Sequence, residues 1–188
     1  MKEFDRPIVL ASGSPRRRDL LSGMGCEFKT IVPDVDEHVD LPADQAVVCL
    51  AERKARAVAE LCADSIVIAC DTLVSLNGKA LGKPSDAADA RRMLRLLSGK
   101  AHDVYSGLCV IDSASMRSVL ECVHSAVRFR VLTDAEICDY VATGEPMDKA
   151  GAYAIQGGAR SFVESIHGSF ENIMGLPIQR LATILNDF

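Results

Sequence analysis

The sequence predicts an α/β fold in which helices flank a mixed, curved central sheet and two lobes enclose a substrate cleft. Short apolar runs typical of buried strands, Ile8–Ala11 and Ser65–Cys70, alternate with segments of helical periodicity. Two longer segments of strand character, 102–111 and 117–131, flank a short turn and indicate an antiparallel section. The 188 residues are 48% hydrophobic, which suffices for the core of a single domain covering 1–188.

The first strand leads through a turn of small residues into a helix. Ser12, Gly13 and Ser14 form this turn. Ser14 is placed to cap the helix, and Pro15 suits its first position. Residues 16–18 are arginines, although the helix N-terminus already carries positive potential. A bound anion would relieve this conflict. The local pattern therefore leaves two interpretations open, a phosphate site or a capped helix with solvated arginines.

Two acidic positions are candidates for metal binding or catalysis. Glu37 belongs to an acidic loop, 33–38, which is either a solvated turn or a source of carboxylate for a divalent metal. Asp71 follows the buried strand that we expect to end at Cys70, and open α/β sheets bind ligands beyond the carboxyl ends of such strands. Asp71 is alternatively the cap of a turn, although the chain continues at once as a strand over 73–76 and needs no cap.

A hairpin is expected directly after Asp71. Asn77-Gly78 is a strong signal for a two-residue turn, which would pair 72–76 with 79–82. This pairing would bring Lys83 close to Asp71. Ser85 is then expected to cap a helix over 86–98.

Periodicity and capping signals define the remaining elements. Helical spacing covers 43–62, where Lys54 is expected on a solvated face unless the helix lines a cleft. Thr133 and Glu136 form a capping box that opens a helix over 134–142. The other expected elements are a strand at 27–32, a strand at 161–166 and a C-terminal helix opened by 175–177.

The segment 145–157 has no regular period but is rich in glycine and charge. It contains the adjacent pair Asp148 and Lys149. Such a loop is a candidate wall of a ligand site. An ordinary surface connection is the alternative, although the apolar residues between 150 and 155 favour burial.

Composition and charge exclude several classes of function. The net charge of −5 disfavours a nucleic-acid polymer as partner, but a few converging cations can still hold a small polyanion. The seven cysteines form no C-x-x-C pair, which suits a reducing cytoplasm. His102 has no second histidine at metal-ligand spacing and is expected to be structural. The N-terminus lacks the pattern of a signal peptide, and no apolar stretch approaches the ~18 residues of a membrane span.

Eight short motifs, in this order and spacing, resemble the Maf family. Each is weak alone, but together they cover nearly the whole chain. They are Ala11-Ser-Gly-Ser-Pro-Arg-Arg17, Asp71-Thr72, Leu81-Gly-Lys-Pro84, Leu97-Ser-Gly99 with His102, Gly144-Glu-Pro146, Asp148-Lys-Ala-Gly-Ala-Tyr153, Ile155-Gln-Gly157 and Gly175-Leu-Pro177. The resemblance implies a Maf/ITPase-like fold.

Maf-like proteins are nucleoside triphosphate pyrophosphatases. The resemblance therefore implies hydrolysis of the α–β phosphoanhydride of a nucleotide, with Mg²⁺ or Mn²⁺ as cofactor. The stretch 148–157 resembles the branch that acts on dTTP and UTP, and modified pyrimidine nucleotides remain open as substrates. A house-cleaning role in the cytoplasm and a homodimer are further expectations of the resemblance.

The resemblance also assigns roles to individual residues. Asp71 matches the family's proton acceptor, and its role as base, metal ligand or both stays open. The implied metal ligands are Glu37 and Asp71. Specificity positions match Arg16, Thr72 and Gln156, of which the amide of Gln156 suits the O4/N3 edge of uracil or thymine. The implied phosphate-binding residues are Ser12, Ser14, Arg16, Arg17, Lys54 and Lys83, and Asp148 and Lys149 complete the cleft.

Two alternative functions remain open on the sequence. The chain could be a nucleotide-binding regulator of cell division and septum formation, in which hydrolysis is a slow by-product. It could also be a pyrophosphatase of the 7-methyl-GTP or ITP/XTP type, which would bind and cleave the triphosphate in the same kind of cleft but prefer another base. Turnover and base preference distinguish these functions from the first.

Overall fold

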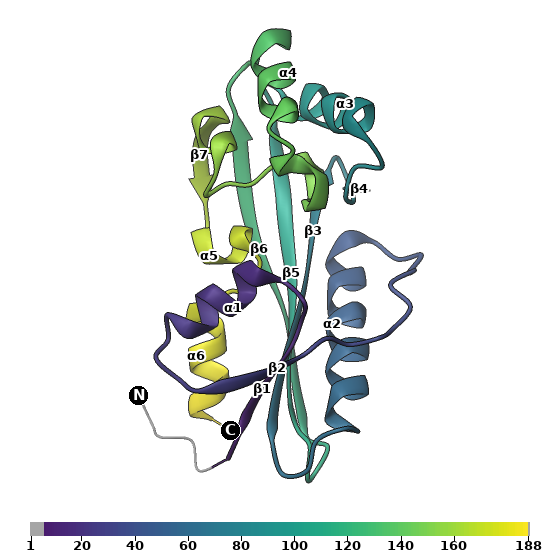
Figure 1. The fold of residues 1–188 in the computed structure, drawn as a ribbon, viewed down its shortest axis with the longest axis vertical. Coiled ribbons are helices and arrows are strands. Elements are labelled where there is room, and N and C mark those ends of the chain that lie inside the picture. Colours follow the sequence, from purple (N-terminus) through teal and green to yellow (C-terminus); the bar gives the residue numbers. More distant parts are fainter. Residues whose placement is uncertain (1–5, 188) are drawn as a thin grey trace.

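The computed structural model describes residues 6–187 and consists of a mixed sheet with helices on both faces (Figure 1). Its seven strands follow the order β2-β1-β3-β5-β6-β7, and β4 pairs with β3 off this path. The predicted fold class is thus confirmed. The strands are β1 (Ile8–Ala11), β2 (Phe28–Ile31), β3 (Ile66–Leu76), β4 (Lys79–Leu81), β5 (Ala101–Asp112), β6 (Ser118–Phe129) and β7 (Val163–His167). The helices are α1 (Pro15–Ser22), α2 (Ala43–Ala59), α3 (Ala87–Leu97), α4 (Asp134–Ala142), α5 (Phe170–Met174) and α6 (Ile178–Asn186), with 3₁₀ turns η1 (Glu145–Asp148), η2 (Ala150–Ala152) and η3 (Gly158–Phe162).

The lower lobe in Figure 1 contains the parallel part of the sheet. β1 pairs in parallel with β2 on one side and with β3 on the other. One face of these strands packs against α2, and the other packs against α1 and α6. Because both faces are covered, β1 is buried along its whole length, which explains its unbroken apolar sequence.

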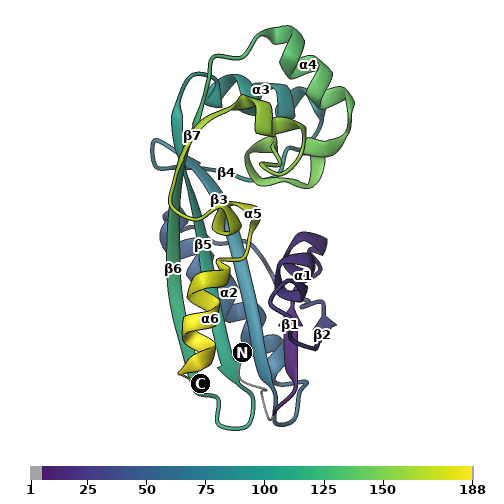
Figure 2. The same ribbon diagram turned by 90° about the vertical axis from the view of Figure 1, so that its left-hand side faces the viewer.

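The strands β3, β5 and β6 are long and antiparallel, and they run through both lobes. In the upper lobe they support α3, α4 and the 3₁₀ turns around a core that includes Leu94, Leu97 and Phe129. Figure 2 shows α3 and α4 above α1 and β1, on the same side of the long strands. This arrangement sets the walls of the two lobes facing each other.

Along one edge, β3 changes its neighbour. Its first residues, Ile66–Ile68, pair with β1, and its last, Val74–Leu76, pair with β4. Residues 69–73 lie between these pairings, and within the described chain their strand partner is β5 alone. The lobes separate at this gap in the sheet edge.

The prediction that a strand ends at Cys70 is wrong. β3 continues through Asp71, which lies opposite Gly107 of β5. β3 continues beyond the end of its pairing with β1, because β5 still provides backbone hydrogen bonds along the other edge of the strand. Asp71 therefore reaches the cleft from the middle of a strand, at the gap, and not from a loop.

Several local signals placed elements correctly. The Asn77-Gly78 turn joins β3 to β4, with Leu76 opposite Lys79. The capping box of α4 is formed as predicted. The Ser14 hydroxyl caps α1 by accepting a hydrogen bond from the Arg17 N–H at 3.5 Å.

Other boundaries differ from the prediction. Asp86, and not Ser85, caps α3, because its carboxylate accepts from the Asp89 N–H at 2.7 Å. The last strand begins at Val163, since the preceding residues form the turn η3. The short helix α5 was not predicted. Helix α2 ends at Ala59, three residues before the expected end.

Two further findings concern the cysteines and the helices. All seven cysteines are free. Within residues 6–187 we find no helix with the length and hydrophobicity that crossing a bilayer requires.

Replacing Gly107 by alanine should destabilise the fold, because the added Cβ would lie 2.0 Å from the Val47 carbonyl oxygen of α2. The backbone must then shift, and we expect a loss of about 3 kcal/mol or more in the free energy of unfolding measured in urea. Gly82→Ala is the control, because nothing lies within 4 Å of its added Cβ. The control should change stability by less than about 0.5 kcal/mol. Equal effects of the two substitutions would contradict this account of the packing.

Candidate active site

A cleft of about 600 Å³ lies between the lobes, a volume typical of small-molecule sites. Residues from both lobes line it, including all those that the sequence marked as candidates. These are Ser12, Ser14, Arg16, Arg17, Glu37, Lys54, Asp71, Thr72, Lys83, Asp148, Lys149 and Gln156. Segments far apart in the chain therefore meet at the gap in the edge of β3.

The turn after β1 forms the lower wall of the cleft. The Ser12 side chain is buried, and its hydroxyl accepts from the Ser14 N–H at 3.1 Å. The adjacent helix α1 begins at Pro15, which has no N–H, and the Ser14 hydroxyl accepts the Arg17 N–H, so the helix end offers the Arg16 N–H beside the cleft. The hydroxyls and helix terminus thus face the same space as the arginines, which is the arrangement that an anion requires.

The guanidinium group of Arg17 is held by three hydrogen bonds within the protein. Its Nε donates to the Gly175 carbonyl at 2.8 Å. Its Nη1 donates to the Ser12 hydroxyl at 3.4 Å, and its Nη2 donates to the Thr72 hydroxyl at 3.3 Å. Arg17 is therefore not a solvated arginine: it joins the turn after β1 to β3 and to the end of α5.

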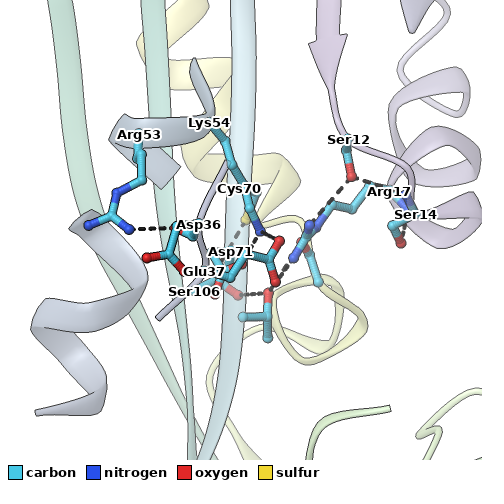
Figure 3. A network of polar contacts seen from close by, with 12 residues as sticks. Ser12, Ser14, Arg17, Asp36, Glu37, Arg53, Lys54, Cys70, Asp71 and Ser106 are labelled. Carbon is cyan, nitrogen blue, oxygen red and sulfur yellow. Dashed lines mark hydrogen bonds and ion pairs between the residues drawn. The ribbon is translucent and has the colours of Figure 1, made fainter. Parts of the chain in front are cut away.

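Lys54 and Asp71 form a buried ion pair at the centre of the cleft (Figure 3). The Lys54 Nζ lies 2.6 Å from the Asp71 Oδ1 and 2.7 Å from the Glu37 Oε1. Lys54 is 6% exposed and Asp71 is 8% exposed. Lys54 is thus on the buried face of α2, and because this helix lines the cleft, the alternative to a solvated face holds at this position. The charge is tolerated there because it is paired twice.

Lys54 stabilises the ionised form of Glu37. The hydrogen bond from Lys54 lowers the pKa of Glu37, and the positive charges of Lys54, Lys83 and Arg17 add to this effect against partial burial. The loop that carries Glu37 is fastened to α2, because the Arg53 Nη1 donates to the carbonyl of Asp36 (Figure 3). The acidic loop is therefore part of the site through Glu37, although most of its side chains remain exposed.

One ion pair crosses the cleft from α1 to η1. The Arg16 Nη1 lies 3.6 Å from the Asp148 Oδ2. Partial burial raises the pKa of Asp148, but the hydrogen bond from Lys149 and the charges of Lys149 and Arg16 outweigh it, so the pKa is lowered. The pair places a cation of the lower lobe opposite the segment that carries Gln156.

His102 lies behind the upper wall and is structural, as expected. Its side chain is buried, its Nε2 is 2.9 Å from the Tyr153 hydroxyl, and its ring packs edge-on against Phe129. Burial lowers the pKa of His102 to about 4, so the ring is neutral at physiological pH. It anchors the segment around Tyr153 and does not face the cleft.

Sequence reasoning missed the polar residues behind Thr72. The Ser106 hydroxyl lies 2.8 Å from the Thr72 hydroxyl and donates to the Asn172 carbonyl at 3.2 Å. The Asn172 side chain in turn donates to the Ser125 hydroxyl at 3.0 Å. No local sequence pattern indicates these contacts, because Ser106 lies within a long strand and Asn172 lies on helix α5, which was not predicted.

The two acidic side chains fit a divalent metal whose remaining ligands come from elsewhere. Glu37 and Asp71 already converge on one cation, the ammonium of Lys54. Within residues 6–187 there is no group of three His, Cys, Asp or Glu side chains that could hold a metal. One or two carboxylates completed by water and substrate phosphates are the usual protein contribution to a Mg²⁺ site.

Comparison with known proteins agrees with this cleft. The family model described as Maf-like protein matches residues 7–188. The chain belongs to the Maf family. A dTTP/UTP pyrophosphatase of Desulforamulus reducens is 48% identical over 185 residues, covering 97% of both chains. The dTTP/UTP pyrophosphatase of Pelotomaculum thermopropionicum is equally similar over the same length, and that of Clostridium botulinum strain Kyoto is 47% identical over 95% of both chains. The resemblance found in the eight motifs of this Maf-family chain is confirmed.

The lowered pKa of Glu37 predicts a pH-dependent contribution to stability. A depressed folded-state pKa stabilises the protein above the ordinary value of 4.5, and this contribution disappears as pH falls through the folded-state pKa. The free energy of unfolding of the wild type should therefore exceed that of Glu37→Gln at neutral pH, and the difference should vanish in acid. Denaturation in urea across this pH range measures it. In a Lys54→Met background the difference should already be small at neutral pH; a large difference there would contradict the assignment to Lys54.

Proposed function

We propose that this Maf-family chain hydrolyses dTTP and UTP to the nucleoside monophosphate and pyrophosphate. The observation that carries the proposal is one buried carboxylate, Asp71, held by Lys54 in a cleft with a cationic wall. The names of the relatives at 47–48% identity support the substrate class. Modified pyrimidine nucleotides belong to the same proposal, as part of a house-cleaning role.

The cations of the cleft suit a triphosphate. In our proposal the phosphate oxygens are held by the hydroxyls of Ser12 and Ser14, by N–H groups of the turn, and by the guanidinium groups of Arg16 and Arg17. Lys83, across the gap, neutralises further charge. Such preformed charge stabilises a transition state in which negative charge spreads over the phosphoryl oxygens.

Asp71 is the proposed general base. Lys54 donates to its Oδ1 at 2.6 Å, so we assign the Oδ2 to accept a proton from the attacking water. The water oxygen forms a bond to the α-phosphorus, and the bond from that phosphorus to the bridging oxygen breaks. The electron pair leaves with pyrophosphate, and the water proton passes to Asp71.

A divalent metal, Mg²⁺ or Mn²⁺, fits the same residues. Glu37 and Asp71 would hold it, and it would supply neutralising charge on the phosphates. Asp71 thus has two proposed roles, base and ligand. Lys54 orients Asp71 in both, because it fixes one of the two carboxylate oxygens.

Gln156 is the residue that we propose to recognise the nucleobase of the substrate. Its amide can donate to O4 and accept from the N3–H of uracil or thymine. We also propose that Thr72 and Arg16 contribute to substrate specificity. Thr72 is held by Arg17 and Ser106, and Arg16 lies against Asp148 on the wall that carries Gln156.

The remaining expectations concern the whole protein. We propose that residues 1–188 form one domain, since β3, β5 and β6 pass through both lobes. The cytoplasm remains the proposed compartment, in keeping with seven free cysteines. A homodimer remains a prediction of the family resemblance.

The decisive experiment is a pyrophosphate-release screen over dTTP, UTP, CTP, GTP, ITP, XTP and 7-methyl-GTP, with Mg²⁺ or Mn²⁺. We expect turnover to be highest with dTTP and UTP. Stoichiometric binding of dTTP with almost no pyrophosphate released would favour the regulator of cell division. A preference for ITP, XTP or 7-methyl-GTP would assign the chain to another type of pyrophosphatase.

Asp71→Asn should lower pyrophosphate release from dTTP by at least about 100-fold, because the amide cannot accept the proton of water. Circular dichroism should show an unchanged fold. Asp139→Asn on the exposed face of α4 makes the same chemical change outside the cleft and should leave turnover intact. Wild-type turnover in Asp71→Asn would remove this residue from the mechanism.

Gln156→Glu should alter the base preference, because a carboxylate cannot donate to O4. We expect kcat/KM for dTTP and UTP to fall by about tenfold or more relative to that for GTP. The matched control is Gln45→Glu, an exposed position on α2 outside the cleft. An unchanged ranking of dTTP, UTP and GTP would exclude Gln156 from base recognition.

A further inference from the structure

Gln156 is the exposed tip of a segment whose two ends are buried. Ala154 and Ile155 precede it at 4% and 2% exposure, and Ala159 follows at 0%. A side chain at such a tip is placed by whatever fixes the backbone on either side of it. The contacts of residues 154 and 158 therefore decide where the amide of Gln156 lies in the cleft.

A tyrosine fixes the first end of this segment. The Ala154 N–H donates to the Tyr140 hydroxyl at 3.0 Å, across a buried contact between the segment and α4. Tyr140 is 5% exposed, and its ring packs edge-on against Phe162. The bond joins a buried donor to a rigid side chain, so its loss would leave the Ala154 N–H unsatisfied.

A glutamate fixes the second end. The Gly158 N–H donates to the Glu145 Oε2 at 3.0 Å. The same carboxylate lies close to the backbone of Gly157, where an added Cβ would be 1.8 Å from the Glu145 Oε1. Glycine at position 157 thus lets the carboxylate approach the backbone directly beside Gln156.

The two anchors bracket the segment. Tyr140 accepts from the Ala154 N–H before Gln156, and Glu145 accepts from the Gly158 N–H after it, so residues 155–157 lie between two fixed backbone groups. Burial raises the pKa of Tyr140, the hydrogen bond from Ala154 opposes this, and the neighbouring Glu145 raises it again, so the hydroxyl remains protonated.

We propose that Tyr140 and Glu145 are positioning residues that set the base preference of the cleft through Gln156. The inference rests on the proposed function. Neither side chain lines the cleft, so neither touches the nucleotide. Discrimination by hydrogen bonds requires donors and acceptors held within a fraction of an ångström, and the two anchors on either side of Gln156 supply that constraint.

Tyr140→Phe and Glu145→Gln test the proposal through steady-state kinetics with dTTP, UTP, CTP and GTP. Each should lower the ratio of kcat/KM for dTTP to that for GTP by about tenfold. The loss should arise from a higher KM for dTTP and UTP, because the α-phosphorus reacts at Asp71 and not at the base. Tyr105→Phe is the matched control: it removes a hydroxyl from a ring that packs on His124 outside the cleft, and it should leave the ratio unchanged.

A double-mutant cycle separates positioning from a general loss of structure. If Tyr140 acts through Gln156, then Tyr140→Phe should add nothing to the ratio already lowered by Gln156→Ala. Effects that add in the double mutant would overturn the inference. So would an equal fall in kcat/KM for all four nucleotides. Should Tyr140→Phe fail to fold, Glu145→Gln in the same cycle carries the test.

The outcome distinguishes this inference from the function on which it rests. A wild-type protein that releases no pyrophosphate from dTTP or UTP would overturn the proposed function. A wild-type protein that prefers dTTP and UTP, with a preference unchanged in Tyr140→Phe and Glu145→Gln, would overturn the positioning role alone.

Discussion

The gap along one edge of β3 is the constraint on which the rest of the site depends. β1 pairs with the start of this strand and β4 with its end, while β5 supports the other edge throughout. Because the backbone ladder on the β5 side is unbroken, the strand continues across the gap and presents Asp71 to the cleft. The turn after β1 and the helix N-terminus of α1 then reach the same opening from below.

Lys54 allows an acidic group to be buried at that opening. Burying Asp71 alone would be strongly unfavourable, and the ammonium of Lys54 compensates both this carboxylate and that of Glu37. Arg17 has a comparable structural part on the other side, since its three hydrogen bonds join β1, β3 and the end of α5. The polar groups of the cleft are therefore held by one another before any ligand arrives.

The sequence predicted the fold class and the lining of the cleft better than it predicted the contacts inside the cleft. Strand and helix signals are local, so the hairpin at Asn77-Gly78 and the cap at Ser14 followed from a few neighbouring residues. Helical periodicity alone left Lys54 between a solvated face and a cleft, because a charge within a helical period normally faces water and its carboxylate partners lie in distant segments. The continuity of β3 through Asp71 depends on β5, some forty residues later, and no local pattern reports such a pairing.

The long strands have a consequence for how a ligand is admitted. The strands β3, β5 and β6 pass through both lobes and join them, and the turn after β1 completes the lower wall of the cleft. Rotating one lobe against the other would therefore bend hydrogen-bonded ladders, which resist deformation far more than a hinge loop does. We therefore expect the shape of the cleft to change little on binding, so that little conformational entropy is lost and selectivity follows from the shape already present.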